Sequence, residues 1–201
     1  MKTKSIALIS FLLFTFAINA QNALLDSVSL DTISAITSID EAMKHPLDVI
    51  KLDLKRKHLK KFPLEILKCT NLQYLDLGKN NIDEIPHEIG EMKDLQYLSL
   101  SKNKLQDVPV EIGQLTNLFY LNLNQNDLGS LPPTIGYLVN LRVLDMWSNT
   151  IDKFPEEMKN LKNLNYLELR VIMIPDAEQA RLKRLLPETK IEFSPYCKCQ
   201  Q

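Results

Sequence analysis

The sequence has few of the residues from which catalytic and metal sites are commonly built. Its three histidines, His45, His58 and His87, are far apart and lack the spacing of metal ligands. It contains no glycine-rich phosphate loop and no GxSxG nucleophile motif. These absences disfavour a metalloenzyme, a nucleotide-binding enzyme and a serine hydrolase. We therefore expect a protein that is not an enzyme and needs no metal ion or cofactor.

Cysteine is also scarce, with three residues in the chain. Cys69 occupies an apolar position of a repeating pattern, so we expect it to be buried and unreactive. Cys197 and Cys199 lie in a short tail that we assign to residues 195–201. For these two, a disulfide to another chain and no role at all are both open alternatives.

The chain lacks a strong charge of either sign, because 24 Lys and Arg residues face 25 Asp and Glu residues. This balance gives no reason to expect binding to nucleic acid or to an acidic membrane. With only five glycines and ten prolines, the composition is not that of a disordered chain. The 201 residues are enough for one folded domain.

A long hydrophobic run is found only at the N-terminus. Lys2 and Lys4 precede an apolar run from Ser5 to Ile18, and Ala20 offers a small residue for cleavage. The run is shorter than the roughly 20 residues that span a bilayer. A signal peptide over residues 1–20 is therefore favoured over an uncleaved anchor, and we expect no membrane span in the mature chain. The protein would be secreted or lie in the periplasm or cell envelope.

What the chain does have is a repeat of 23 residues. The stretch LQYLDLGKNNI begins at Leu72, and related stretches begin at Leu95, Leu118 and Leu141. Less regular copies begin at residues 49 and 164. A fixed period of this size is typical of a solenoid built from stacked units.

The pattern LxxLxLxxNxLxxLPxxIGxLxN resembles leucine-rich repeat proteins of the 23-residue type, such as the Ras-binding scaffolds and many bacterial secreted proteins. The resemblance covers about Val49 to Ile174. It implies an α/β solenoid shaped as a curved horseshoe, with short parallel strands on the concave face. It also implies that one asparagine per repeat points inward to satisfy backbone groups of the loops. These residues are Asn80, Asn103, Asn126 and Asn149.

The ends of the repeat array carry signals of caps. Residues 21–37 are weakly patterned and read as an exposed lead-in. Ser38 to Glu41 fits a capping box, which predicts a short helix over the first repeat. Pro175 to Leu186 predicts a helix, and 190–194 a last strand, which together resemble a C-terminal cap. The repeat domain with both caps then spans 38–194.

A column of tyrosines is the sharpest feature of the predicted concave face. Tyr74, Tyr97, Tyr120 and Tyr166 share one outward strand position, and Trp147 lies nearby. Tyrosine and tryptophan are enriched at binding hot spots. They also stack on neighbouring strands for stability alone. Binding and stacking are compatible, and we favour binding.

A second column, inside each LxL, is mostly acidic or amidic. It comprises Asp53, Asp76, Ser99, Asn122, Asp145 and Glu168. Since two adjacent carboxylates cannot supply the six to eight oxygens that Ca²⁺ takes, we expect ordinary solvated positions and no metal.

The first repeat is basic, and Lys79 and Lys102 continue its charge across two more repeats. Such a patch suits an acidic surface on a protein or glycan partner. The alternative is a charged edge that prevents end-to-end association.

These observations predict an exported, non-enzymatic module that binds another protein through its concave face. The alternative is a carbohydrate-binding or surface-adhesion module, for which aromatic and amide side chains are equally suited. The residues expected to contact the partner are Tyr74, Tyr97, Tyr120, Tyr166, Trp147, Asp76, Asn122, Asp145, Arg170, Lys79 and Lys102.

Overall fold

The structure is a computed structural model that describes residues 24–194, in two units that we treat separately. The first unit extends to Ile33 and contains helix α2 (Ser27–Thr32). The Asp26 carboxylate caps this helix by accepting the Ser29 N–H at 2.9 Å. The expected signal peptide (1–20) and tail (195–201) lie outside the described residues.

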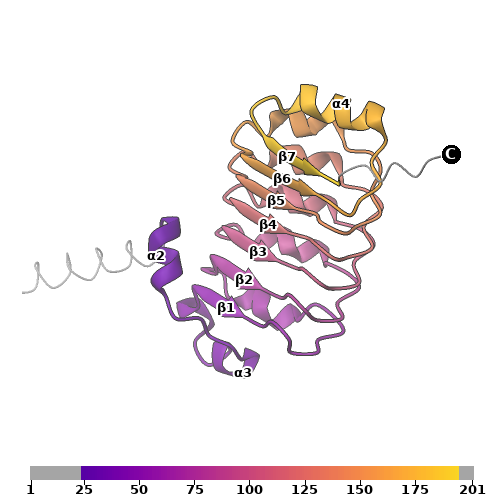
Figure 1. Cartoon of the computed structure of the whole chain (residues 1–201). Helices are drawn as coiled ribbons and strands as arrows, with labels where there is room; N and C mark the ends of the chain where they lie inside the picture. Colours follow the sequence, from indigo (N-terminus) through magenta and orange to yellow (C-terminus); the bar gives the residue numbers. More distant parts are fainter. Residues whose placement is uncertain (1–23, 195–201) are drawn as a thin grey trace, which may run out of the picture. The chain divides into compact units, whose positions relative to one another are not determined.

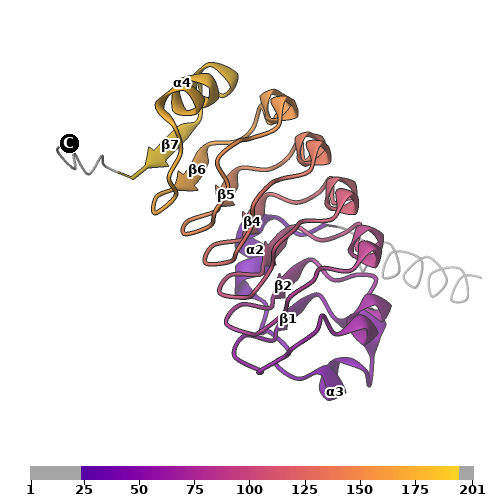
Figure 2. The ribbon, with the colours of Figure 1, turned by 90° about the vertical axis from the view of Figure 1, so that its right-hand side faces the viewer.

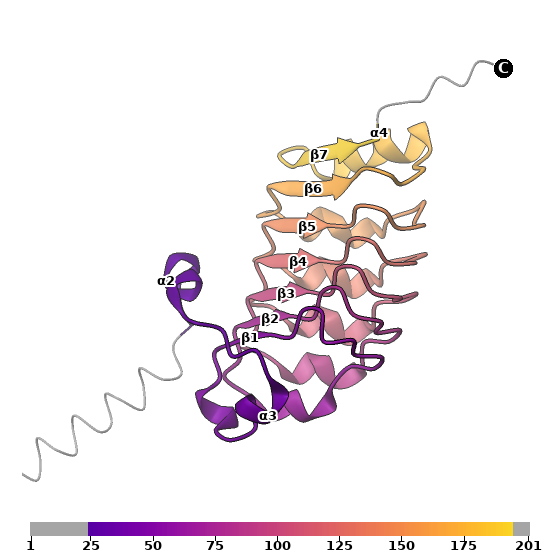
Figure 3. The same cartoon turned by 60° about the horizontal axis from the view of Figure 1, so that its bottom comes forward.

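The second unit is built on one sheet of seven parallel strands whose spatial order follows the chain (Figure 1). The strands are β1 (Lys51–Asp53), β2 (Tyr74–Asp76), β3 (Tyr97–Ser99), β4 (Tyr120–Asn122), β5 (Val143–Asp145), β6 (Tyr166–Leu169) and β7 (Lys190–Phe193). Figure 3 shows them as the rungs of a ladder. The predicted solenoid with short parallel strands is thus confirmed.

The register of the sheet turns sequence columns into rows across the strands. From β1 to β6 each residue pairs with the one 23 positions later, as in Tyr74 with Tyr97 and Tyr97 with Tyr120. Side chains that share a repeat position therefore lie side by side, about 4.8 Å apart.

A short 3₁₀ helix forms the return path of each turn, on the side away from the strands (Figure 2). These helices are η1 (Pro46–Asp48), η2 (Leu64–Lys68), η3 (His87–Glu91), η4 (Val110–Gln114), η5 (Pro133–Tyr137) and η6 (Glu156–Asn160). From η2 onward, a proline directly precedes each helix and fixes its entry angle. The helices stack closely enough that a Cβ on Gly113 would lie 2.5 Å from the Thr134 carbonyl oxygen.

The core lies between the strands and the 3₁₀ helices. The central leucines of the strands, such as Leu75, Leu98 and Leu121, are fully buried, as their alternation predicted. Cys69 is buried too, and desolvation raises the pKa of its thiol to about 11. This agrees with the expectation of an unreactive cysteine.

The asparagine row forms the predicted internal ladder. Asn126 Oδ1 accepts the Leu105 N–H at 3.1 Å, and its Nδ2 donates to the carbonyls of Leu100 and Leu123 at 3.0 Å. Asn80, Asn103 and Asn149 make corresponding bonds in their own repeats. Each asparagine thereby ties its own repeat to the preceding one.

At the N-terminal end, helix α3 (Ile39–Ala42) begins after Ser38 as predicted. The Ser38 side chain makes no capping hydrogen bond, so that half of the capping box is not formed. Ile36, in the segment expected to be an exposed lead-in, is half-buried and bridges to Leu52 of β1. Ile36 therefore pairs with the outer edge of the first strand.

The C-terminal cap consists of helix α4 (Asp176–Leu185) and strand β7, as the sequence predicted. Two side chains of α4 attach it to the turn at Phe154. Glu178 accepts the Phe154 N–H at 3.0 Å, and Arg181 donates to the Phe154 carbonyl. Arg181 also pairs with Glu178 at 2.7 Å and with Glu156 at 2.8 Å.

Candidate partner-binding face

We call the outward side of β1–β6, with the outward residues of the turn that follows each strand, the strand face. Its centre is a stack of three tyrosines. The ring centroids of Tyr74 and Tyr97 lie 4.1 Å apart, and those of Tyr97 and Tyr120 lie 4.4 Å apart, with nearly parallel planes. Burial, and then the neighbouring tyrosines, raise the pKa of Tyr97. The stacking interpretation is therefore confirmed, and all three tyrosines remain partly exposed.

Tyr166 lies outside this stack because Val143 occupies the tyrosine position of the strand between. Its hydroxyl instead donates to Glu168 Oε2 at 2.8 Å. That hydrogen bond raises the pKa of Tyr166 to about 12. The four predicted tyrosines thus form a stack of three and one separate residue.

The acidic column differs from the prediction of solvated positions. Asp76 is only 4% exposed and Glu168 only 5%. Each side chain folds back to accept the backbone N–H two residues later, at 2.7 Å from Gly78 and 3.0 Å from Arg170. The same capping occurs at Asp53, Asn122 and Asp145. At five of its six positions the column therefore closes the turn after the strand, a role that polar side chains often have, while Ser99 Oγ lies 3.4 Å from Ser101 Oγ instead.

Glu168 and Arg170 form a second fixed unit on the face. Arg170 donates to both carboxylate oxygens of Glu168, at 2.9 and 2.6 Å. Burial favours the neutral acid, but the bonds from Arg170 outweigh it, and the pKa of Glu168 lies below its usual range. The guanidinium of Arg170 is thereby held in one orientation while the residue stays exposed.

Asp145 and Asn124 lie between that unit and the tyrosine stack. Asn124 Nδ2 donates to Asp145 Oδ2 at 2.6 Å, while burial raises the pKa of Asp145. Among the buried side-chain nitrogen and oxygen atoms of residues 24–194, Asn124 Oδ1 is the one without a hydrogen-bond partner. Trp147, which follows Asp145 by two residues, is half-buried. The second half of the face is thus polar and aromatic.

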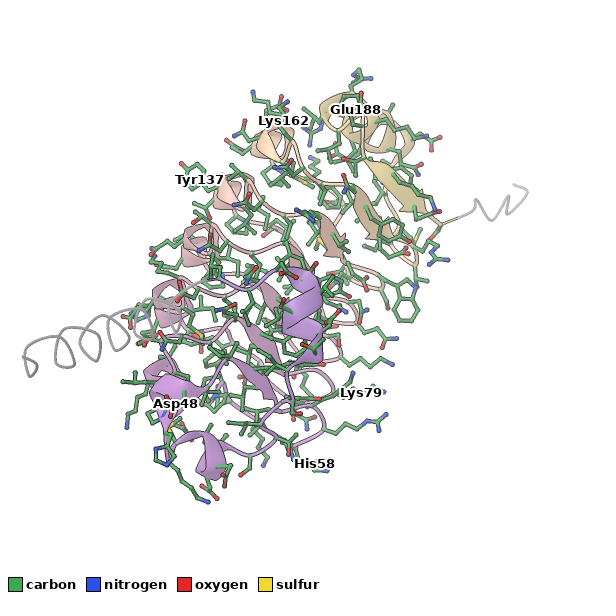
Figure 4. The ribbon with its side chains drawn as sticks, turned by 90° about the vertical axis from the view of Figure 1, so that its left-hand side faces the viewer. Asp48, His58, Lys79, Tyr137, Lys162 and Glu188 are labelled. Carbon is green, nitrogen blue, oxygen red and sulfur yellow. The ribbon has the colours of Figure 1, made fainter. Side chains whose placement is uncertain are left out.

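Basic side chains lie at the turns that follow the first three strands. Arg56, Lys79 and Lys102 have positive φ angles of 59°, 55° and 56°. The backbone N–H of each still bonds across to the next repeat, at 2.8–3.1 Å. Figure 4 shows Lys79 and His58 on one side of the strands, and Asp48 and Tyr137 on the other.

An open depression of about 500 Å³ lies beside the first two of these turns. Its lining comprises Thr37, Asp53, Lys55, Arg56, Lys57 and Lys79. The positive-φ row was not foreseen, because none of its members is glycine, the usual signal. What its members share in the sequence is the place before the asparagine position, which Lys57 occupies in the first repeat.

Two further properties concern residues 24–194 alone. Nowhere in this range do three or more His, Cys, Asp or Glu side chains gather as a metal site would require. No helix of the range is long and apolar enough to cross a membrane.

A family model described as a leucine-rich repeat region matches residues 45–188. The chain belongs to the leucine-rich repeat family. No curated protein matches it by sequence. The family accounts for the asparagine ladder and the strand spacing, which are shared by all regular repeats of the chain.

Several solved leucine-rich repeat structures are similar to this chain. A leucine-rich repeat protein of Leptospira interrogans is 36% identical, with a TM-score of 0.61 over 73% of this chain and 43% of its own. Internalin C2 of Listeria monocytogenes has a TM-score of 0.67 at 23% identity, over 80% of this chain and 67% of its own, which shows the fold alone. The plant peptide hormone receptor RGFR1, solved in complex with RGF2, is 33% identical, with a TM-score of 0.61 over 73% of this chain and 24% of the receptor. The chain thus spans less than half of the Leptospira protein.

Proposed function

We propose that this protein is an exported, non-enzymatic module that binds another protein through its strand face. The observation that carries the proposal is the partly exposed stack of Tyr74, Tyr97 and Tyr120, with Trp147 two strands beyond its centre. Aromatic side chains of this kind supply large contact areas at interfaces and are enriched at hot spots.

The stack is also rigid before any partner arrives. Each tyrosine is held by the ring beside it and by the fixed register of the strands. A surface whose side chains are already ordered loses less conformational entropy on binding. The stacking of the tyrosines would therefore contribute both to the stability of the sheet and to binding.

The comparisons support a protein partner over other classes. The RGFR1 structure is a complex of a repeat receptor with RGF2, and GASSHO1/SCHENGEN3 of Arabidopsis thaliana, 30% identical, was solved with Casparian strip integrity factor 2. By analogy, the repeat face of this chain binds a peptide or protein. The polar start and apolar run of residues 1–20 support export.

The test is affinity capture from the envelope and medium of the source organism, read by mass spectrometry. The bait is compared with the double variant Tyr120→Ala/Trp147→Ala, which changes the strand face, and with Tyr137→Ala. Tyr137 is a matched control because it is 59% exposed on the return path. We expect a captured protein to be bound at least about tenfold more weakly by the double variant, and unchanged by the control.

Equal capture by all three baits would refute binding through the strand face. Loss with Tyr137→Ala alone would move the site to the 3₁₀-helix side. Displacement of the captured material by soluble glycans would favour the carbohydrate-binding alternative. Circular dichroism of each variant verifies that the fold is retained.

A further inference from the structure

The positive charge of the strand face is concentrated in its first three repeats. Arg56, Lys79 and Lys102 occupy one row, and the next three members of that row are Gln125, Ser148 and Val171. Within residues 24–194, none of the three cations forms an ion pair. The row is thus a short line of unneutralised charge.

The nearby carboxylates are already engaged. Asp53 accepts the Lys55 N–H at 2.9 Å, and Asp76 accepts the Gly78 N–H at 2.7 Å. Asp76 Oδ2 also lies 3.5 Å from Lys55 Nζ. This carboxylate therefore pairs with Lys55 and not with the cations of the row. Repulsion from neighbouring cations lowers the pKa of Lys79. Arg56 is the largest cause, followed by desolvation, Lys102 and Lys55.

The backbone holds this row in place. All three residues adopt left-handed φ angles, which costs free energy for side chains other than glycine. Their N–H groups extend the ladder of the sheet by one more bond after each strand. Because neighbouring strands are about 4.8 Å apart, the three cations span about 10 Å.

We propose that the Arg56–Lys79–Lys102 row, with the adjoining depression, binds an acidic segment of the partner protein. This inference rests on the proposed protein-binding function, because it specifies the chemistry of the partner. About four residues of extended chain cover the span of the row, at roughly 3.4 Å per residue. Carboxylates of such a segment would neutralise the row, while its neighbouring side chains reach the tyrosine stack.

The limited length of the row favours a peptide over an anionic polysaccharide. A polysaccharide carries its charges in a long regular series and would be matched by cations in every repeat. Here the fourth to sixth repeats present an amide, a hydroxyl and a valine at the same position. A local acidic cluster within a mixed protein surface matches this pattern better.

The test measures binding of a fluorescent, short polyglutamate peptide to the full chain by anisotropy, at low and at physiological salt. The row variant is Arg56→Gln/Lys79→Gln/Lys102→Gln. The matched control, Lys68→Gln/Lys162→Gln/Arg184→Gln, removes the same charge from exposed residues elsewhere. A polyglutamine peptide and a heparin oligosaccharide serve as comparison probes.

We expect saturable binding of polyglutamate that weakens with salt, about a tenfold loss in the row variant and less than a twofold loss in the control. Equal losses in both variants, or no polyglutamate binding, would overturn the proposal. Tighter, row-dependent binding of heparin would overturn it in favour of a polysaccharide. The Tyr120/Trp147 capture experiment reads a different part of the face, so failure here leaves the proposed function separately testable.

Discussion

Replacing Asn126 by alanine tests whether the asparagine ladder stabilises the solenoid beyond its leucine core. The side chain is buried and makes three bonds of 3.0–3.1 Å to backbone groups of its own repeat and the preceding one, with a longer bond of 3.4 Å to the Asn124 carbonyl. In the variant, the Leu105 N–H loses the side-chain acceptor that it has now.

None of the three carbonyls that lose this donor is left unpaired, since the Asn124 carbonyl still accepts the Lys102 N–H at 2.8 Å. Leu100 still accepts from Asn103, and Leu123 still accepts from Asn149. A buried donor without a partner costs about 1–3 kcal/mol, and each weakened carbonyl adds less than the usual contribution of about 1 kcal/mol. We therefore expect Asn126→Ala to lower the free energy of unfolding by about 2–3 kcal/mol.

Urea denaturation followed by far-UV circular dichroism measures this effect, with Asn117→Ala as the control. Asn117 donates a single exposed bond to the Lys93 carbonyl, so its loss should cost less than about 1 kcal/mol. Hydrogen exchange of the Leu105 amide should also accelerate in the Asn126 variant. Equal unfolding midpoints for the two variants would refute the reasoning.

Two further predictions concern packing and pH. Gly136→Ala should destabilise the protein by about 1–3 kcal/mol, because the new Cβ would lie 2.8 Å from the Glu157 Cβ and overlap the Glu157 carbonyl. Gly129→Ala is the control, because nothing lies within 4 Å of its new Cβ, and it should not destabilise the protein. Similar melting temperatures for the two variants would contradict this packing argument. Glu178 has a lowered pKa, chiefly through its bond from Arg181, so its contribution to stability is present above the ordinary value of 4.5 and is lost as the pH falls through the folded value. Urea midpoints at neutral and acidic pH should therefore depend less on pH in Glu178→Gln, and an unchanged dependence would show that the contact adds nothing.

The sequence was sufficient to predict the architecture because the same 23-residue pattern occurs several times in it. Leu75, Leu98 and Leu121 recur at a fixed period, and the register of the sheet follows that period directly. The caps were also predictable in outline, since proline and the apolar pattern mark both ends of α4. The contact of Glu178 and Arg181 with Phe154 was not, because it joins residues whose proximity depends on how α4 lies on the last turns.

For the candidate site, position was easier to predict than environment. The outward direction of Tyr97 and Asp76 follows from strand alternation. That Asp76 is nevertheless buried depends on its bond to the Gly78 N–H, a local choice of side-chain rotamer that periodicity does not encode. The break in the tyrosine row was visible at Val143, and its consequence, a separate bond from Tyr166 to Glu168, required the structure.

The constant register of β1 to β6 has a consequence for how such a chain can change over evolution. Because every residue pairs with the one 23 positions later, a tandem duplication of one whole repeat keeps all existing pairings. Copying residues 118–140 would leave both ends intact and move Trp147 and Arg170 about 4.8 Å further from Lys102. Each duplicated repeat would therefore increase the distance between the cationic and aromatic ends of the face by one strand spacing, with no change in the residues of either end.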